Sequence, residues 1–169
     1  RGAFVNPLGW LSLTGAAPNQ ERSLVVRGPR MSDHKYFAAS FDLYIGGGTG
    51  SGAHGENRTG GEGVSICLGD LPDAPFGESG AGEGLRVSLL TDAEAMEVHY
   101  DRELIMRRHV ERSRFRAERF LPMRIEYGPL GLSIHVDGFA LADEVLLDAW
   151  SPLPTWRFGM GARTSERTD

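Results

Sequence analysis

A glycine-rich, polar stretch carries the side chains of this sequence that are best suited to binding a small polar ligand. His54, Glu56 and Asn57 lie within residues 46–63, between two segments in which apolar residues alternate with other residues. Imidazole, carboxylate and amide groups can hydrogen-bond the hydroxyls of a sugar, and a loop held by a sheet is a common binding surface. The same composition is also typical of a loop that is only mobile.

The same stretch contains an acceptor sequence for N-glycosylation. Asn57-Arg58-Thr59 has the required Asn-x-Thr pattern without proline. Such a sequon is used only in secreted or surface proteins. We therefore predict glycosylation at Asn57 and an extracellular or cell-surface location.

A second group of polar side chains recurs every other residue in one predicted strand. Glu97, His99 and Asp101 would share one strand face, where they could bind a metal or act as an acid/base pair. A solvated strand face is the more common origin of such a pattern. His135 and Asp137 have the same two interpretations. The chain has no G-x-S-x-G, H-E-x-x-H or Walker motif. We predict no catalytic residue, no metal site and no cofactor.

Composition narrows the classes of partner. The 169 residues fit one domain, and the formal net charge of -5 argues against a nucleic-acid partner. No apolar run reaches the roughly 18 residues of a membrane helix, so we predict no membrane insertion within this segment. The single cysteine, Cys67, excludes an internal disulfide, and its apolar surroundings predict a buried, inert thiol.

Seven arginines are concentrated between residues 102 and 119. They could bind a local anionic partner, but acidic residues are interleaved with them, which favours a solvated surface of mixed charge. Within this region, residues 112–120 fit either a helical turn or a bulged edge strand.

Apolar residues recur with a period of two along most of the chain, and this period predicts strands. The Asp137-Gly138 pair between two such segments is typical of a type I′ hairpin turn. Residues 71–84 are too rich in Pro and Gly for a regular element. We predict an all-β, antiparallel jelly-roll sandwich in a single domain over residues 1–169, forming part of a larger protein. The predicted strands are 11–13, 24–26, 41–45, 64–68, 85–89, 96–100, 104–106, 123–127, 132–136, 139–141, 145–147 and 158–162.

Several segments, taken in order, resemble a known superfamily. Gly9–Leu13 precedes Phe41–Ile45, and Gly61–Leu68, Gly84–Leu89 and Phe158–Thr164 follow. Together they resemble the concanavalin A-like lectin/glucanase superfamily, particularly its L-type lectin-like modules. The resemblance covers most of the chain and implies two large antiparallel sheets with sugar bound at loops beside one of them.

The resemblance also implies where a sugar and a metal would bind. The sugar-binding aspartate of the family falls at Glu62, which is one methylene longer. The metal-binding lectins carry two carboxylates at positions that correspond to Ser88 and Leu90, so we predict that the calcium and manganese site is absent. The carboxylate spacing of the glucanase branch is also missing.

Tyr44, Phe76 and Tyr100 are candidates for an aromatic platform under a sugar, with core packing as the alternative. The predicted ligand-binding residues are Tyr44, His54, Glu56, Glu62, Gly63 and Asp70.

These observations predict a non-enzymatic recognition module. It would bind glycan, or a neighbouring extracellular protein domain, through the loops at 46–63 and 72–84. The resemblance implies that it belongs to a large secreted or cell-surface protein, such as a protein of the ciliary surface. One alternative is a structural interaction domain that has lost sugar binding. A glycoside hydrolase is the less favoured alternative, because the carboxylate motif is missing.

Overall fold

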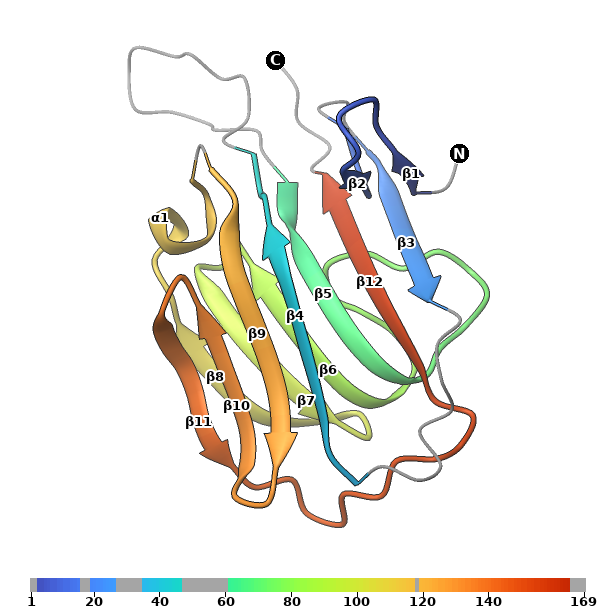
Figure 1. The fold of residues 1–169 in the computed structure, drawn as a ribbon, viewed down its shortest axis with the longest axis vertical. Helices are drawn as coiled ribbons and strands as arrows, with labels where there is room; N and C mark the ends of the chain where they lie inside the picture. The colour runs from blue at the N-terminus through green and yellow to red at the C-terminus, as the bar shows by residue number, and fades with distance from the viewer. Residues whose placement is uncertain (1–2, 16–18, 27–34, 47–60, 118, 165–169) are drawn as a thin grey trace.

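The computed structural model describes residues 3–15, 19–26, 35–46, 61–117 and 119–164. Two antiparallel sheets are stacked face to face (Figure 1), so the predicted all-β sandwich is confirmed. A two-stranded hairpin, β1 (Phe4–Val5) with β2 (Leu11–Ser12), lies beside them. No helix in the described ranges is long and apolar enough to cross a membrane.

The larger sheet has six strands. In spatial order they are β3 (Glu21–Val26), β12 (Arg157–Thr164), β5 (Gly61–Asp70), β6 (Glu83–Leu90), β7 (Ala95–Tyr100) and β8 (Glu103–His109). The smaller sheet has four strands, in the order β11 (Phe139–Val145), β10 (Gly131–Val136), β9 (Leu121–Gly128) and β4 (Phe37–Leu43). Every ladder within the two sheets is antiparallel.

The alternation of apolar residues sets which face of each strand is buried. Val64 lies opposite Leu89, which in turn lies opposite Met96, and all three are at most 3% exposed between the sheets. Because directly opposed residues in a ladder project to the same side, this register brings the apolar rows of β5, β6 and β7 into one core. The other face of the six-stranded sheet, called the outer face below, carries Ser65 and Cys67.

The strand predictions are largely confirmed, although β1 was not predicted and β4 begins four residues before the predicted 41–45. The last hairpin strand runs to Val145, so residues 145–147 do not form a separate strand. Of the two interpretations of residues 112–120, the helical turn is correct: α1 (Arg112–Phe115) is one turn long. Its Phe115 is fully buried in the core, because α1 closes the space between the two sheets beside β8 and β11.

The expectation that the concentrated arginines form only a solvated surface is wrong for part of the set. The side chain of Arg116 is 6% exposed and donates to Thr91 Oγ1 at 3.0 Å. Arg108 donates to the backbone carbonyls of Ala140 and Leu141 on β11, at 3.1 and 2.9 Å. These arginines connect elements of the fold.

The segment between β5 and β6 is packed on the outer face of the six-stranded sheet. Phe76 is 4% exposed and forms a small second core with Cys67 and Leu71. This packing requires glycine in β12: a Cβ on Gly161 would lie 2.5 Å from the Phe76 ring and 2.6 Å from two carbonyl oxygens. Ser65 Oγ donates to the Gly77 carbonyl at 2.7 Å and fixes the segment to β5.

Candidate functional site

Two carboxylates meet one arginine on the outer face, at the end where β5 begins. Arg163 Nε lies 3.2 Å from Glu62 Oε2, and Arg163 Nη1 lies 3.8 Å from Glu78 Oε1. Glu62 is near the start of β5, Arg163 comes from β12, and Glu78 comes from the packed segment. The three residues are separated in sequence but are brought together by the β5–β12 ladder; we call them the Glu62 cluster.

Glu78 is the most buried member of the cluster. It is 8% exposed, its Oε1 accepts from Ser79 Oγ at 3.3 Å, and its Oε2 is buried without a hydrogen-bond partner. A buried carboxylate oxygen without a donor costs on the order of 1–3 kcal/mol or more. A ligand hydroxyl would reach the cluster at its more exposed members, Glu62 and Arg163, whose side chains are 23% and 43% exposed.

A second polar row crosses the same face on β6, β7 and β8. Glu97 accepts from Arg107 Nη1 at 2.9 Å and lies 3.1 Å from His99 Nε2. The side chains of Glu97 and His99 are 17% and 16% exposed. The predicted solvated strand face is therefore wrong for these two residues, because their hydrogen bonds hold them against the sheet. Asp101 is exposed in the following turn and does not join them.

The residues near the family's metal position do not fit calcium. Ser88 is 1% exposed with a buried, unpartnered Oγ, and Leu90 offers no oxygen from its side chain. The nearest carboxylates are already paired with cations: Glu97 with Arg107, and Asp92 with Arg116 at 3.6 Å. Hard Ca²⁺ requires six to eight oxygen ligands, and adjacent arginines oppose it. Within the described part of the chain, no group of three or more His, Cys, Asp or Glu residues could hold a metal ion.

The structure separates the predicted ligand-binding residues. Glu62 and Gly63 are adjacent, but Asp70 is at the opposite end of β5, about 26 Å away at roughly 3.3 Å per residue. Gly63 has a structural requirement of its own: its φ is 149°, and a Cβ there would lie 2.0 Å from the Leu89 carbonyl oxygen. His54 and Glu56, together with the sequon at Asn57, lie outside the described residues.

Of the three aromatic platform candidates, two are core residues. Phe76 and Tyr100 are 4% and 6% exposed. Tyr44 is 48% exposed and packs on Phe120 at a centroid distance of 5.5 Å, and the 47% exposed Trp10 also packs on Phe120, at a centroid distance of 4.7 Å. Tyr44 therefore contributes to an exposed aromatic group on the smaller sheet's side of the molecule.

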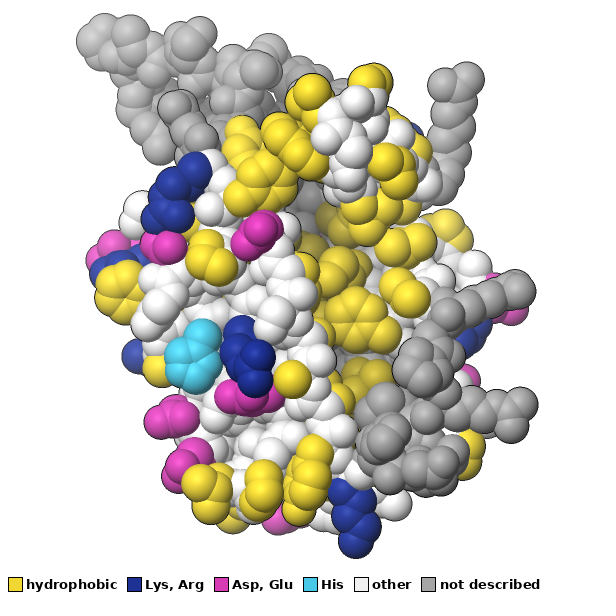
Figure 2. All heavy atoms as spheres, in the orientation of Figure 1, with side chains coloured by type: hydrophobic (Ala, Val, Ile, Leu, Met, Phe, Trp, Pro, Cys, Tyr) yellow, Lys and Arg dark blue, Asp and Glu magenta, His cyan; other side chains and the backbone are white. Residues whose placement is uncertain are grey.

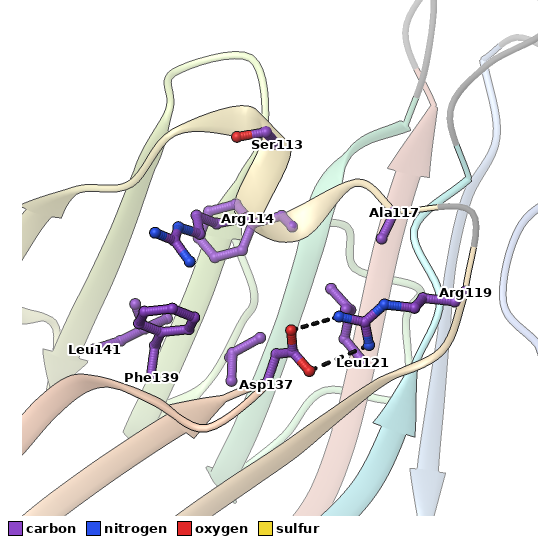
Figure 3. A pocket seen from close by; sticks show the side chains of 10 residues that line it. Ser113, Arg114, Ala117, Arg119, Leu121, Asp137, Phe139 and Leu141 are labelled. Atoms are coloured by element: carbon purple, nitrogen blue, oxygen red, sulfur yellow. Dashed lines mark hydrogen bonds and ion pairs between the residues drawn. The ribbon is translucent and has the colours of Figure 1, made fainter.

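Two hollows in the described part of the molecule lie away from the Glu62 cluster. The hollow between α1 and the β10–β11 turn has a volume of about 110 Å³. Arg119 lies against Asp137 there, and Arg114 lies beside Phe139 (Figure 3). Arg119 Nη1 and Nη2 donate to the two carboxylate oxygens of Asp137 at 3.1 and 2.5 Å, and Arg114 Cζ is 3.9 Å from the centroid of the Phe139 ring. Ligand pockets usually measure about 300–1,000 Å³, so this hollow is too small for most ligands. A wider, open hollow of about 410 Å³ crosses β4, β9 and β10 beside Arg124 and His135.

Sequence reasoning identified Glu62 and missed its partners. Arg163 lies in the late segment that resembles the lectins, but only the pairing of β12 with β5 places it beside Glu62. Glu78 lies in a Pro- and Gly-rich segment, where the sequence carries no sign that a carboxylate would be buried.

The chain has the fold of L-type lectin domains. It matches the exoplasmic/lumenal domain of VIP36 in its Ca²⁺/Man-bound form with a TM-score of 0.66 and 14% identity, over 99% of this chain and 75% of that one. It matches the carbohydrate recognition domain of Emp47p with a TM-score of 0.65 and 14% identity, over 97% and 78% of the two chains. It also matches the potassium-bound carbohydrate recognition domain of Emp46p, with a TM-score of 0.60 and 16% identity, over 89% of this chain and 74% of that one. No protein-family model matches the chain, and no curated protein matches its sequence significantly.

Proposed function

We propose that this chain is a non-enzymatic carbohydrate recognition module that binds sugar at the Glu62 cluster on the outer face of the six-stranded sheet. The observation that carries the proposal is the meeting of Glu62, Glu78 and Arg163 on one face, where the side chains of Glu62 and Arg163 are 23% and 43% exposed. Carboxylate acceptors beside a guanidinium donor match the paired hydroxyls of a sugar.

The similar solved domains support this choice of ligand. The VIP36 domain is bound to mannose and calcium, and the Emp46p and Emp47p domains are carbohydrate recognition domains. Because the described residues near the family's metal position do not fit calcium, we infer that binding here depends on the protein's own side chains. The extracellular or cell-surface location, the single domain and glycosylation at Asn57 remain part of the proposal.

One observation favours the second candidate, a structural interaction domain without sugar binding. Arg163 is shared by both carboxylates of the cluster, as in an ion pair whose role is to hold the packed segment to β12. A carboxylate can accept several hydrogen bonds at once, so the ion pair and a sugar are compatible.

A glycan array that includes mannose-rich glycans, probed with and without EDTA, separates the two candidates. The recognition module predicts binding that EDTA does not change and that Glu62→Gln reduces at least tenfold. Glu126→Gln is the matched control, because Glu126 also pairs with an arginine, Arg124, but lies exposed on the smaller sheet. Absence of binding in both conditions would support the structural domain, and EDTA-sensitive binding would contradict the assignment of a metal-independent site.

Location and catalysis have separate tests. Mass spectrometry of secreted native material should find glycan on Asn57, and an unmodified Asn57 would remove that part of the proposal. Hydrolysis of a β-glucan that is abolished by Glu97→Gln would show that the protein is an enzyme after all.

A further inference from the structure

The hollow of about 110 Å³ between α1 and the β10–β11 turn is not part of the proposed sugar site, and we call it the α1 hollow. Its buried lining belongs to the main core, and each of these side chains is at most 7% exposed: Phe115, Leu121, Val136 and Leu141. Its outer lining includes Arg114, Arg119, Asp137 and Phe139 (Figure 3). Figure 2 shows basic, acidic and hydrophobic side chains gathered at the left edge of the molecule, where Figure 1 places α1 and β11.

The sequence after α1 leaves this space open. α1 is a single turn, and the backbone becomes extended at Arg116, so the chain crosses the core without a second helical turn. The next residue, Ala117, lines the hollow but fills little of it, because its side chain ends at Cβ. The α1 hollow is therefore an opening to apolar core surface beneath a charged rim.

The two arginines of the rim differ in their partners. Arg119 donates to both carboxylate oxygens of Asp137, at 3.1 and 2.5 Å, so the one carboxylate of the described lining is already paired. Arg114 is held over the Phe139 ring and forms no hydrogen bond or ion pair with another described residue. A guanidinium stacked on an aromatic ring keeps its donors available and is oriented before an anion arrives.

The size and the apolar walls of the α1 hollow limit what can enter it. Because a cavity of about 150 Å³ holds benzene, a hollow of about 110 Å³ has room for about four carbon atoms. Water in an apolar hollow finds few partners, so an alkyl group that displaces this water is favoured. A short alkyl group therefore suits the interior, and an anionic head group suits the stacked guanidinium at the rim.

We propose that the α1 hollow binds a small-molecule carboxylate, whose short alkyl group packs against Leu121 and Val136 and whose carboxylate pairs with Arg114. Guanidinium and carboxylate are both planar, so the pair can form two parallel hydrogen bonds. This chemistry is shared by the C-terminus of a polypeptide, but β11 beside the hollow does not suit a peptide. Arg108 donates to two of its backbone carbonyls, those of Ala140 and Leu141, so these carbonyls are already occupied.

The test uses isovalerate, a carboxylate with a four-carbon alkyl group, followed by NMR titration of the protein. Isovalerate should bind in a 1:1 ratio with a dissociation constant in the millimolar range, as expected for so small a ligand. The shifted amide signals should be those of α1 and of residues 136–141. Isovaleramide lacks the charge and acetate lacks the alkyl group, so each should bind at least tenfold more weakly.

Variants separate the two halves of the proposed site. Arg114→Gln should weaken isovalerate binding at least tenfold but change isovaleramide binding less than twofold, because only the carboxylate uses the guanidinium. Ala117→Leu fills the hollow and should weaken both ligands. Arg124→Gln is the matched control, because Arg124 is also an exposed arginine beside a carboxylate, on the smaller sheet away from the α1 hollow, and should change binding less than twofold.

Several outcomes would overturn the proposal. Equal binding of isovalerate and isovaleramide would exclude the role of Arg114, and equal binding of isovalerate and acetate would exclude the role of the hollow. Unchanged α1 signals in a large excess of isovalerate would exclude the site. Tighter binding of N-acetyl-leucine than of isovalerate would identify a chain end as the occupant instead. Arg114 is exposed, so Arg114→Gln tests the site even if Ala117→Leu lowers stability.

Discussion

Replacing Gly161 with alanine should detach the segment around Phe76 from the outer face. Gly161 is in the middle of β12, where a Cβ would lie 2.5 Å from the Phe76 ring and 2.6 Å from the carbonyl oxygens of Phe76 and Gly77. Real Cβ atoms do not approach other atoms so closely, and two of these neighbours are backbone. The added methyl group therefore requires the segment to move away.

The cost follows from what the segment buries. Phe76 is 4% exposed, and burial of a phenylalanine side chain contributes about 1.5–3 kcal/mol. The hydrogen bond from Ser65 Oγ to the Gly77 carbonyl contributes about 0.5–1.5 kcal/mol. Loss of both lowers the free energy of unfolding by about 2–4.5 kcal/mol. With a urea m-value of about 2 kcal/mol/M, the midpoint falls by about 1–2 M.

Cys67 provides a local readout of the same event. Its side chain is 1% exposed in the small core with Phe76, and burial raises the pKa of the Cys67 thiol. Thiolate reagents should therefore label the native protein slowly, through rare openings. In Gly161→Ala the segment that covers the thiol is detached, and labelling should accelerate at least about tenfold.

Gly128→Ala is the control, because a Cβ at Gly128 would meet no atom within 4 Å. It should change the unfolding free energy by less than about 0.5 kcal/mol and leave Cys67 labelling unchanged. If Gly161→Ala behaved like Gly128→Ala in both assays, the packed position of the segment would be refuted, and with it the placement of Glu78 beside Arg163. Lower stability with unchanged labelling would show that strain is relieved elsewhere in β12.

Two further predictions concern the side of the sandwich that α1 closes. Phe115→Ala should cost about 3–5 kcal/mol in urea unfolding because the ring is fully buried, and a cost below about 1 kcal/mol would show that α1 does not close the core. The hydrogen bonds from Arg119 hold the pKa of Asp137 below its ordinary value of 3.8, so this carboxylate stabilises the fold above that value, and the contribution is lost as the pH falls through the lowered pKa. Asp137→Asn should therefore be less stable than the wild type at pH 7, with a difference that disappears in acid, and a difference independent of pH would contradict the ion pair.

Strand positions could be predicted because alternation is a local property. The apolar rows of 64–68, 85–89 and 96–100 appear in the sequence, and they are the buried rows of β5, β6 and β7. The choice between a helical turn and an edge strand at 112–120 could not be made in the same way. It depends on whether a gap between two sheets is available to Phe115, which is a property of the whole fold.

The candidate site could be predicted only in part, for a similar reason. Resemblance to lectins singled out Glu62, but its partners depend on the pairing of β12 with β5, about a hundred residues later in the chain. The arginines between 102 and 119 show the same limit. Charge patterning predicts solvated side chains, whereas the position of β11 beside β8 gives Arg108 two carbonyls to bind.

The sequence by itself determined the all-β class and the apolar face of most strands, because a period of two allows each strand only one way to bury its apolar side chains. It also placed a polar, glycine-rich stretch before Glu62. Only the tertiary structure decided that Glu62 meets Arg163 and Glu78 on the outer face, and that β4 is the last of the described strands in the smaller sheet. Both features depend on the order and relative extent of the strands in space, and a local sequence pattern contains neither.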